Sequence, residues 1–156
     1  MIQENFIKIY EKSFKKNWEL PALTDYSKGT TFSFADVAKE IARIHILFEE
    51  CQIRRGDKIA LIGKAIIVPI LQDFSPNDVH HIINHSESVF LFVSDRIWDT
   101  LEEEMIEDVR GVFSLSDFRC LHQRDGESIQ KLLKGMDEKM AEKYPDGFGK
   151  DDIEYA

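Results

Sequence analysis

The fold is decided by residues 75–93, which read SPNDVHHIINHSESVFLFV. Ser75 offers a capping oxygen, Pro76 suits the first helical position and Asp78 places an acid in the first turn, so a helix is predicted to begin here. The side chains expected to face inward are Val79, Ile82 and Ile83. The apolar run at 89–93 shows no alternation, which is typical of a strand covered on both faces in a parallel sheet.

Helices and strands alternate in both directions from this stretch. Upstream, the patterns predict a helix over 3–16, hairpin strands over 21–26 and 30–34, a helix over 33–51 and buried strands over 58–62 and 65–68. Downstream, they predict a helix over 96–105, a strand over 111–115, a helix over 127–143 and a loop-like tail over 145–152. The expected class is α/β, with a layered, largely parallel sheet and flanking helices.

The helix over 33–51 is expected to bury a stripe of apolar residues at helical spacing. The stripe consists of Val37, Ile41, Ile44 and Phe48, widened by Ala38, Ala42 and Leu47. Ser33 and Asp36 resemble a capping box at its start.

The link between the strands at 58–62 and 65–68 is unusually short. Gly63 and Lys64 alone join them, whereas a parallel pair needs a crossover of about a dozen residues. Gly63 could instead start a tight hairpin turn. Because neither strand alternates, we expect a missing crossover segment between Lys64 and Ala65.

The composition and net charge of the chain disfavour some classes of partner and location. The 156 residues suffice for one ordinary domain, and a hydrophobic content of 43% supports a packed core. The net charge of −9 disfavours nucleic acids and anionic membranes as partners, because Lys15-Lys16 and Arg54-Arg55 read as isolated pairs rather than a basic face. Cys51 and Cys120 have no CxxC partner, which favours a reducing, cytoplasmic location. No signal peptide or membrane-helix pattern is present in the sequence.

Each candidate site has a simpler structural interpretation. Gly63-Lys64 lacks the rest of a P-loop, since Ala65 follows the lysine. Asp78, His81 and His85 share a helix face, but the sequence offers no evident further ligand for a metal. No GxSxG motif is present. Residues 102–104 are expected to be a solvated helix end. Trp18 and Trp98 are expected to pack against other side chains. We therefore predict no catalytic, cofactor-binding or metal residues in this chain.

Four stretches resemble consecutive blocks of one enzyme family. They are residues 31–38 (TFSFADVA), 53–64 (IRRGDKIALIGK), 65–70 (AIIVPI) and 75–93. The family is the AMP-binding acyl-CoA synthetases, whose opening blocks occur in the same order. The resemblance is nearest to bacterial long-chain fatty-acid–CoA ligases, although aryl-CoA ligases, amino-acid adenylation domains and luciferase-like enzymes share these early blocks. In the family a further helix lies at the position where Lys64 meets Ala65.

The resemblance implies that residues 1–156 are the N-terminal part of the large domain of such a ligase, an incomplete subdomain of the adenylate-forming fold. Residues 144–156 would be a linker toward the phosphate loop. The parent enzyme would use ATP, Mg²⁺ and coenzyme A to convert a fatty acid through an acyl-adenylate to acyl-CoA, in lipid metabolism. This chain alone would bind no cofactor and would be inactive.

Its partners would be the remainder of its own chain and, for the parent, the fatty acid, ATP and coenzyme A, with no nucleic acid. A homodimer and peripheral membrane association of the parent stay open, as does the acyl chain length. The alternative is a free-standing α/β binding or regulatory module without catalysis, or a bare interaction domain. A receiver-type module would need acids after its first strand, and residues 58–64 supply none.

Overall fold

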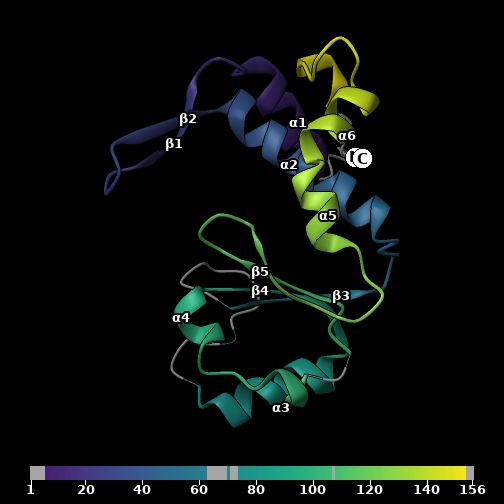
Figure 1. The fold of residues 1–156 in the computed structure, drawn as a ribbon. Coiled ribbons are helices and arrows are strands. Elements are labelled where there is room, and N and C mark those ends of the chain that lie inside the picture. The colour runs from purple at the N-terminus through teal and green to yellow at the C-terminus, as the bar shows by residue number, and fades with distance from the viewer. Residues whose placement is uncertain (1–5, 63–69, 71–73, 107, 154–156) are drawn as a thin grey trace, which may run out of the picture. The chain divides into compact units, whose positions relative to one another are not determined.

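The structure is a computed structural model that describes residues 6–62, 70, 74–106 and 108–153. Its contacts divide the chain into two units, although the length had suggested a single domain. Unit 1 is residues 1–50 with 135–156, and unit 2 is residues 51–134. Figure 1 shows the elements of each unit.

Unit 2 is built on a four-stranded sheet. Its strands, in spatial order, are β3 (Lys58–Ile62), β4 (Ser88–Val93), β5 (Gly111–Ser114) and β6 (Cys120–Gln123). The first three run parallel, and β6 pairs antiparallel with β5. The predicted α/β class with a mostly parallel sheet is confirmed. Strand β6 had not been predicted, because its four half-buried residues, CLHQ, carry no clear period.

The helix α3 (Pro76–Ser86) begins as its sequence predicts. The backbone N–H of Asp78 donates to Ser75 Oγ at 3.3 Å, and Asp78 Oδ2 accepts from the Ser75 N–H at 3.3 Å. This reciprocal capping box satisfies two N–H groups that a helix start would otherwise leave without partners. Glu87, in the left-handed region at φ 53°, ends the helix and leads into β4.

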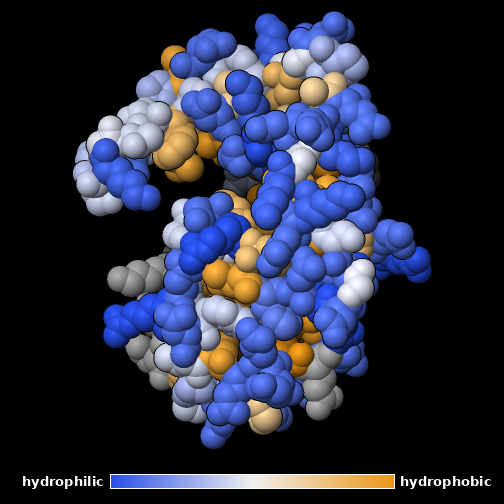
Figure 2. Space-filling model, in the orientation of Figure 1, coloured by the Kyte–Doolittle hydropathy of each residue, from blue (hydrophilic) through white to orange (hydrophobic). Residues whose placement is uncertain are grey.

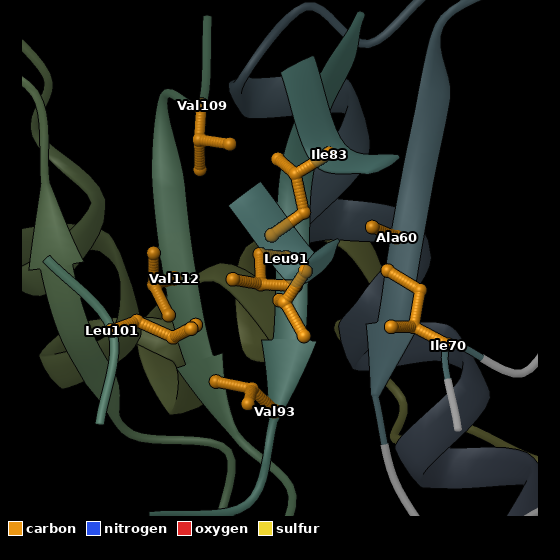
Figure 3. Packing of buried hydrophobic residues seen from close by; sticks show 9 residues of the cluster. Ala60, Ile70, Ile83, Leu91, Val93, Leu101, Val109 and Val112 are labelled. Atoms are coloured by element: carbon orange, nitrogen blue, oxygen red, sulfur yellow. The ribbon is translucent and has the colours of Figure 1, made fainter. Parts of the chain in front are cut away.

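Strand β4 is covered on both faces, as its unbroken apolar run predicts. On one face, Leu91 and Val93 pack with side chains from α3 and the neighbouring strands (Figure 3). The core cluster on this face consists of Ala60, Ile70, Val79, Ile83, Leu91, Val93, Leu101, Val109 and Val112. The other face is aromatic. Phe90 and Phe92 lie with ring centroids 5.1 and 4.8 Å from that of Phe113.

The helix α5 (Ile129–Lys134) approaches β5 closely at Gly111. A Cβ atom at this position would lie 2.5 Å from Ile129 Cδ1 and 3.3 Å from the Phe113 ring. The Gly111 backbone lies outside the left-handed region, so the lack of space, rather than its φ angle, requires glycine here.

We expect Gly111→Ala to lower the free energy of unfolding by about 1–3 kcal/mol, because the surrounding side chains must move to admit a methyl group. Urea denaturation measures this loss. Adding Ile129→Val removes the Cδ1 atom that the new methyl group meets, so the double variant should recover part of the loss. Strictly additive losses in the double variant would contradict the assigned contact.

Unit 1 consists of helices and a hairpin. Its elements are α1 (Phe6–Lys16), β1 (Pro21–Asp25), β2 (Thr30–Ser33), α2 (Phe34–Glu50), α6 (Met136–Lys143) and a 3₁₀ turn, η2 (Lys150–Asp152). The rings of Phe14 and Phe34 pack edge to face at 5.2 Å, which joins α1 to α2. Ion pairs join α2 to α6, namely Arg43–Asp137, Glu49–Lys143 and Glu50–Lys139.

The helix α2 confirms the predicted element and part of its predicted buried stripe, since Ala38, Ala42 and Leu47 are buried as expected. Ser33 and Asp36 form the expected reciprocal hydrogen bonds at its start. The residues buried in the structure are Ala35, Ala38, Ala42, Ile46 and Leu47, whereas Val37, Ile41, Ile44 and Phe48 are only half-buried. The stripe is displaced because the small alanine side chains let neighbouring elements approach most closely on their side of the helix.

Two predicted helices are wrong in extent. The stretch 96–105 contains only the single turn α4 (Asp95–Trp98) and the 3₁₀ turn η1 (Glu103–Met105). In a helix continued to residue 105, the three glutamates at 102–104 would lie near the C-terminal end, where the helix dipole is negative. Repulsion between like charges therefore disfavours the longer helix. The stretch 127–143 is broken at Gly135 into α5 and α6, which belong to different units. Glycine is the weakest helix former after proline, so helical periodicity alone overlooks this break.

Several expectations concern residues outside the described part. These are the strand over 65–68, the joint between Lys64 and Ala65, and the first residues of the helix over 3–16. The missing crossover therefore stays a prediction. The tail is described to Ile153, whose side chain is 1% exposed within unit 1. Its role as a linker also stays a prediction.

Candidate functional site

Unit 1 contains an open hollow of about 530 Å³ at the C-terminal end of α1. Its lining residues are Lys15, Lys16, Asn17, Trp18, Glu19, Leu20 and Lys150. Three lysines against one glutamate make the hollow basic, although the whole chain carries a charge of −9. The hollow therefore offers a positive surface with an indole beside it.

Local hydrogen bonds and ring contacts set the shape of this hollow. The Asn17 N–H donates to Ser13 O at 3.0 Å, and the Leu20 N–H donates to Asn17 O at 2.7 Å, so the chain turns directly after α1. The Trp18 ring lies 6.1 Å from that of Phe148, which brings the tail beside this turn. Lys150, which is distant in sequence, therefore lies beside the C-terminal end of α1.

The lysines of the hollow differ in their partners. Lys15 Nζ pairs with Glu11 Oε1 at 2.7 Å. Among the residues that the structure describes, Lys16 and Lys150 have no ion-pair partner. Lysines near a helix C-terminus also compensate the negative end of the helix dipole. The hollow carries the positive charge of these lysines, but its described lining brings together no acid–base pair for catalysis.

The basic residues of α1 correct one expectation from the sequence. Lys15 and Lys16 had been interpreted as an isolated pair, yet Lys8 and Lys12 lie on the same helix and Lys150 lies beside its end. Lys8, Lys12 and Lys15 stand at i, i+4 and i+7, which places them along one side of a helix. One side of α1 therefore carries three lysines, of which Lys15 is paired with Glu11.

A second polar group lies after the C-terminal ends of β4 and β5, where open α/β sheets commonly bind ligands. Ser116 Oγ donates to Asp95 Oδ2 at 3.2 Å, and Arg119 Nη2 lies 2.9 Å from Asp95 Oδ1. The Ser114 and Ser116 hydroxyls lie 2.7 Å apart. The Arg119 N–H bond to Asp117 lowers the pKa of that carboxyl. Sequence reasoning did not predict this network. Its groups bind one another and thereby hold the conformation of the loop.

The face of α3 that carries Asp78, His81 and His85 is not arranged around a cation. The Asp78 carboxylate accepts from the N–H and hydroxyl of Ser75 in the capping box. The rings of His81 and His85 stack with centroids 5.7 Å apart. Within residues 6–62, 70, 74–106 and 108–153, no group of three or more His, Cys, Asp or Glu could hold a metal ion.

His80, on the inner side of α3, is a buried polar residue that sequence reasoning did not assign. Its side chain is 3% exposed, and Nε2 accepts the backbone N–H of Glu102 at 3.1 Å. Nδ1 is buried without a partner in the described part of the chain. The bond holds the chain where the expected helix over 96–105 is interrupted. Its role is structural.

The other singled-out residues are also structural. Trp98 packs against the core cluster of unit 2, while residues 102–104 are exposed. Both cysteines are free thiols. Burial raises the pKa of the Cys120 thiol, which donates to His122 O at 3.1 Å, so its reactive thiolate is disfavoured. Gly63-Lys64 lies outside the described residues.

Arg110 forms an ion pair with Glu127 between the sheet and α5, which the sequence did not suggest. Arg110 Nε and Nη2 donate to the two carboxylate oxygens of Glu127 at 2.7 and 3.2 Å. Donating these hydrogen bonds to Glu127 raises the pKa of Arg110. The guanidinium carbon lies 6.0 Å from the centre of the Phe90 ring. With both acceptor oxygens of Glu127 engaged, Arg110 serves packing rather than ligand binding.

The comparisons with known proteins identify structural relatives only. No family model and no curated protein matches the sequence. An anthranilate CoA ligase in complex with anthranoyl-AMP matches with a TM-score of 0.62 and 15% identity, over 74% of this chain and 25% of its own. Coronafacic acid ligase from Pectobacterium brasiliense matches with a TM-score of 0.61 and 19% identity, over 80% of this chain and 27% of its own. A natural red-emitting luciferase from Phrixothrix hirtus matches with a TM-score of 0.59 and 11% identity, over 80% and 34%.

In the described part of the chain, no helix has the length and apolar character needed to cross a bilayer.

The chain spans only about a quarter to a third of the length of these solved proteins. At identities of 11–19%, the likeness concerns the fold. The chain therefore has an α/β fold, with a mostly parallel sheet and flanking helices, that matches one part of the fold of these solved proteins.

Proposed function

We propose that this chain is the N-terminal part of an ATP-dependent acid–CoA ligase, with a long-chain fatty acid as the substrate. Two independent observations support the proposal. The fold matches part of an anthranilate CoA ligase and part of a coronafacic acid ligase, and four sequence blocks resemble the opening of acyl-CoA synthetases in the same order. The likeness of the fold supports the proposed ligase class. The proposed fatty-acid substrate is supported by the sequence resemblance alone.

The parent reaction would join a carboxylic acid to AMP and then exchange AMP for coenzyme A. The described residues do not fit Mg²⁺-ATP. They bring together no cluster of acids for the metal, and the lysines of the hollow surround an open surface without a glycine-rich loop. We therefore assign no catalytic step to these residues. Their proposed contribution is the parallel sheet, on which residues from the remainder of the chain would complete the site.

The first test is calorimetric titration of Mg²⁺-ATP into the 156-residue chain. We expect negligible heat and no release of pyrophosphate when a fatty acid is added, because the phosphate-binding groups would lie on other residues. The matched control is the product of the same gene read beyond Ala156, which should bind ATP and form acyl-CoA. Tight ATP binding by the 156-residue chain would instead indicate a self-sufficient module.

The substrate class needs a separate measurement on the longer gene product. Thioester formation should be fastest with long-chain fatty acids and slow with an aromatic acid such as anthranilate. The reverse preference would retain the ligase class and reject the fatty acid. A gene that stops at Ala156 with no ligase activity in trans would reject the ligase class itself.

A further inference from the structure

We propose that His80 makes the attachment of residues 102–105 to α3 dependent on pH, so that this segment is held at neutral pH and released in acid. Two hydrogen bonds from α3 hold the segment. The Glu102 N–H donates to His80 Nε2 at 3.1 Å, and Asn84 Nδ2 donates to Met105 O at 2.7 Å. The inference concerns unit 2 alone and does not depend on the proposed ligase activity.

His80 is one of three buried polar side chains in the described part of the chain, with Ser88 and Ser114. Hydrophilic side chains otherwise cover much of the surface, as the face drawn in Figure 2 shows. The two buried serines have partners, because their hydroxyls lie 2.6 Å from that of Ser86 and 2.7 Å from that of Ser116, respectively. His80 differs, since Nε2 is bonded while Nδ1 is buried without a partner among the described residues.

The bond to Glu102 sets the protonation state of the His80 ring. A ring nitrogen that accepts a hydrogen bond carries no proton, so the proton of the neutral ring lies on Nδ1. A second proton, taken up from solvent, would go to Nε2 and make both nitrogens donors. Nε2–H would then face the Glu102 N–H, and the charge would be buried without a partner. The charged ring is therefore incompatible with this bond.

The ionisable groups around His80 are exposed or paired elsewhere, so none of them provides an acceptor for Nδ1. On α3, the Asp78 carboxylate is engaged in the capping box, and the stacked rings of His81 and His85 are exposed. The other ionisable side chains in the described residues of β3 and of 87–108 are the pairs Lys58–Glu87, Asp95–Arg119 and Glu103–His122, and the exposed Arg96, Asp99, Glu102, Glu104 and Asp108.

A second histidine responds to acid in the opposite direction. His122 Nδ1 lies 3.2 Å from Glu103 Oε2, so this contact becomes an ion pair only when His122 is protonated. The two side chains are 31% and 53% exposed, and water screens such a pair, whereas His80 is 3% exposed. The loss at His80 should therefore outweigh the gain at His122, and the net effect of acid is release.

The remainder of a longer chain would not remove this response. His80 Nδ1 is already sealed within unit 2, so a further segment that packs on the outside cannot reach it without rearranging the unit. Packing over residues 102–105 would add contacts to the segment but no acceptor for Nδ1. The product of the same gene read beyond Ala156 should therefore respond to pH in the same way, and a lack of response there would contradict the inference.

Amide hydrogen exchange followed by NMR from about pH 7.5 to about pH 5 tests the proposal on the 156-residue chain. The protection factor is corrected for the intrinsic effect of pH on exchange, so it reports the opening of the bond. We expect the protection factor of the Glu102 amide to fall in acid. The fall should approach tenfold per pH unit below about pH 6.5, where an ordinary histidine takes up one proton once the segment has opened. Amides at the centre of β4 should keep their protection, because the sheet is not released.

Matched variants separate His80 from the other histidines. His80→Gln retains an oxygen that can accept the Glu102 N–H but cannot titrate, so protection of Glu102 should no longer depend on pH. His81→Gln/His85→Gln removes two exposed histidines of the same helix and should respond as the unaltered chain does. His122→Gln should enlarge the loss of protection in acid, because the opposing ion pair is removed.

A nitrogen-15 spectrum of the unaltered chain at neutral pH provides a test that needs no variant. It should show the proton of the His80 ring on Nδ1 rather than on Nε2. A proton on Nε2, protection of Glu102 that does not depend on pH in the unaltered chain, or pH dependence that persists in His80→Gln would each overturn the proposal. An equal loss of protection at the centre of β4 would also overturn it, since acid would then unfold the whole unit rather than release the segment.

Discussion

Phe113→Ala is expected to lower the free energy of unfolding of unit 2 by about 3–5 kcal/mol. The Phe113 side chain has no solvent exposure, and its ring packs against both Phe90 and Phe92. Truncation would leave a cavity between β4 and β5 on the aromatic face of the sheet. Because a domain is stable by only about 5–15 kcal/mol, this variant should have one of the largest effects available in the chain.

The two tryptophans allow the loss to be assigned to one unit. Trp98 lies in unit 2 and Trp18 in unit 1. Urea denaturation in single-tryptophan backgrounds, Trp18→Phe or Trp98→Phe, therefore reports each unit separately. The control Phe74→Ala deletes the same atoms at a position that is 41% exposed, and it should cost far less. Similar losses from the two variants would contradict the proposed aromatic core.

Ile153→Ala is expected to destabilise unit 1 by about 2–5 kcal/mol. Ile153 follows the turn η2 and is 1% exposed, so its side chain is as well buried as those of the central sheet. Truncation would weaken the packing that holds the tail, with Lys150, beside α1. The hollow should then lose its third lysine as the tail detaches.

The readout is the urea midpoint of Trp18 fluorescence, with Trp98 replaced by phenylalanine. Ile9→Ala is the matched control, because it deletes the same atoms from a side chain of unit 1 that is 45% exposed. An unchanged midpoint for Ile153→Ala would show that residues 144–153 act as a loose linker. A shift of the Trp98 transition alone would contradict the assignment of Ile153 to unit 1.

The candidate site could be anticipated only in part. The absence of a phosphate loop is visible from residues adjacent in sequence, because such a loop needs fixed residue types at fixed spacing. The lysine spacing of α1 is also visible there, although the net charge of −9 gives no sign of it. Lys150 could not be foreseen beside this helix, since more than a hundred residues separate them and tertiary contacts, such as that of Phe148 with Trp18, bring them together.

The sequence by itself determined the elements whose signals are local. The start of α3 at Ser75 and the hairpin depend on capping and turn residues, and the strands β3, β4 and β5 depend on unbroken apolar runs. The prediction that the strand over 58–62 is covered on both faces was wrong, because Lys58 and Ile59 of β3 are exposed at the edge of the described sheet. Tertiary structure alone decided the strand β6, the side of α2 that is buried and the partner of His80. Each of these depends on contacts between residues distant in sequence, whose packing energies exceed the fraction of a kcal/mol by which local propensities differ.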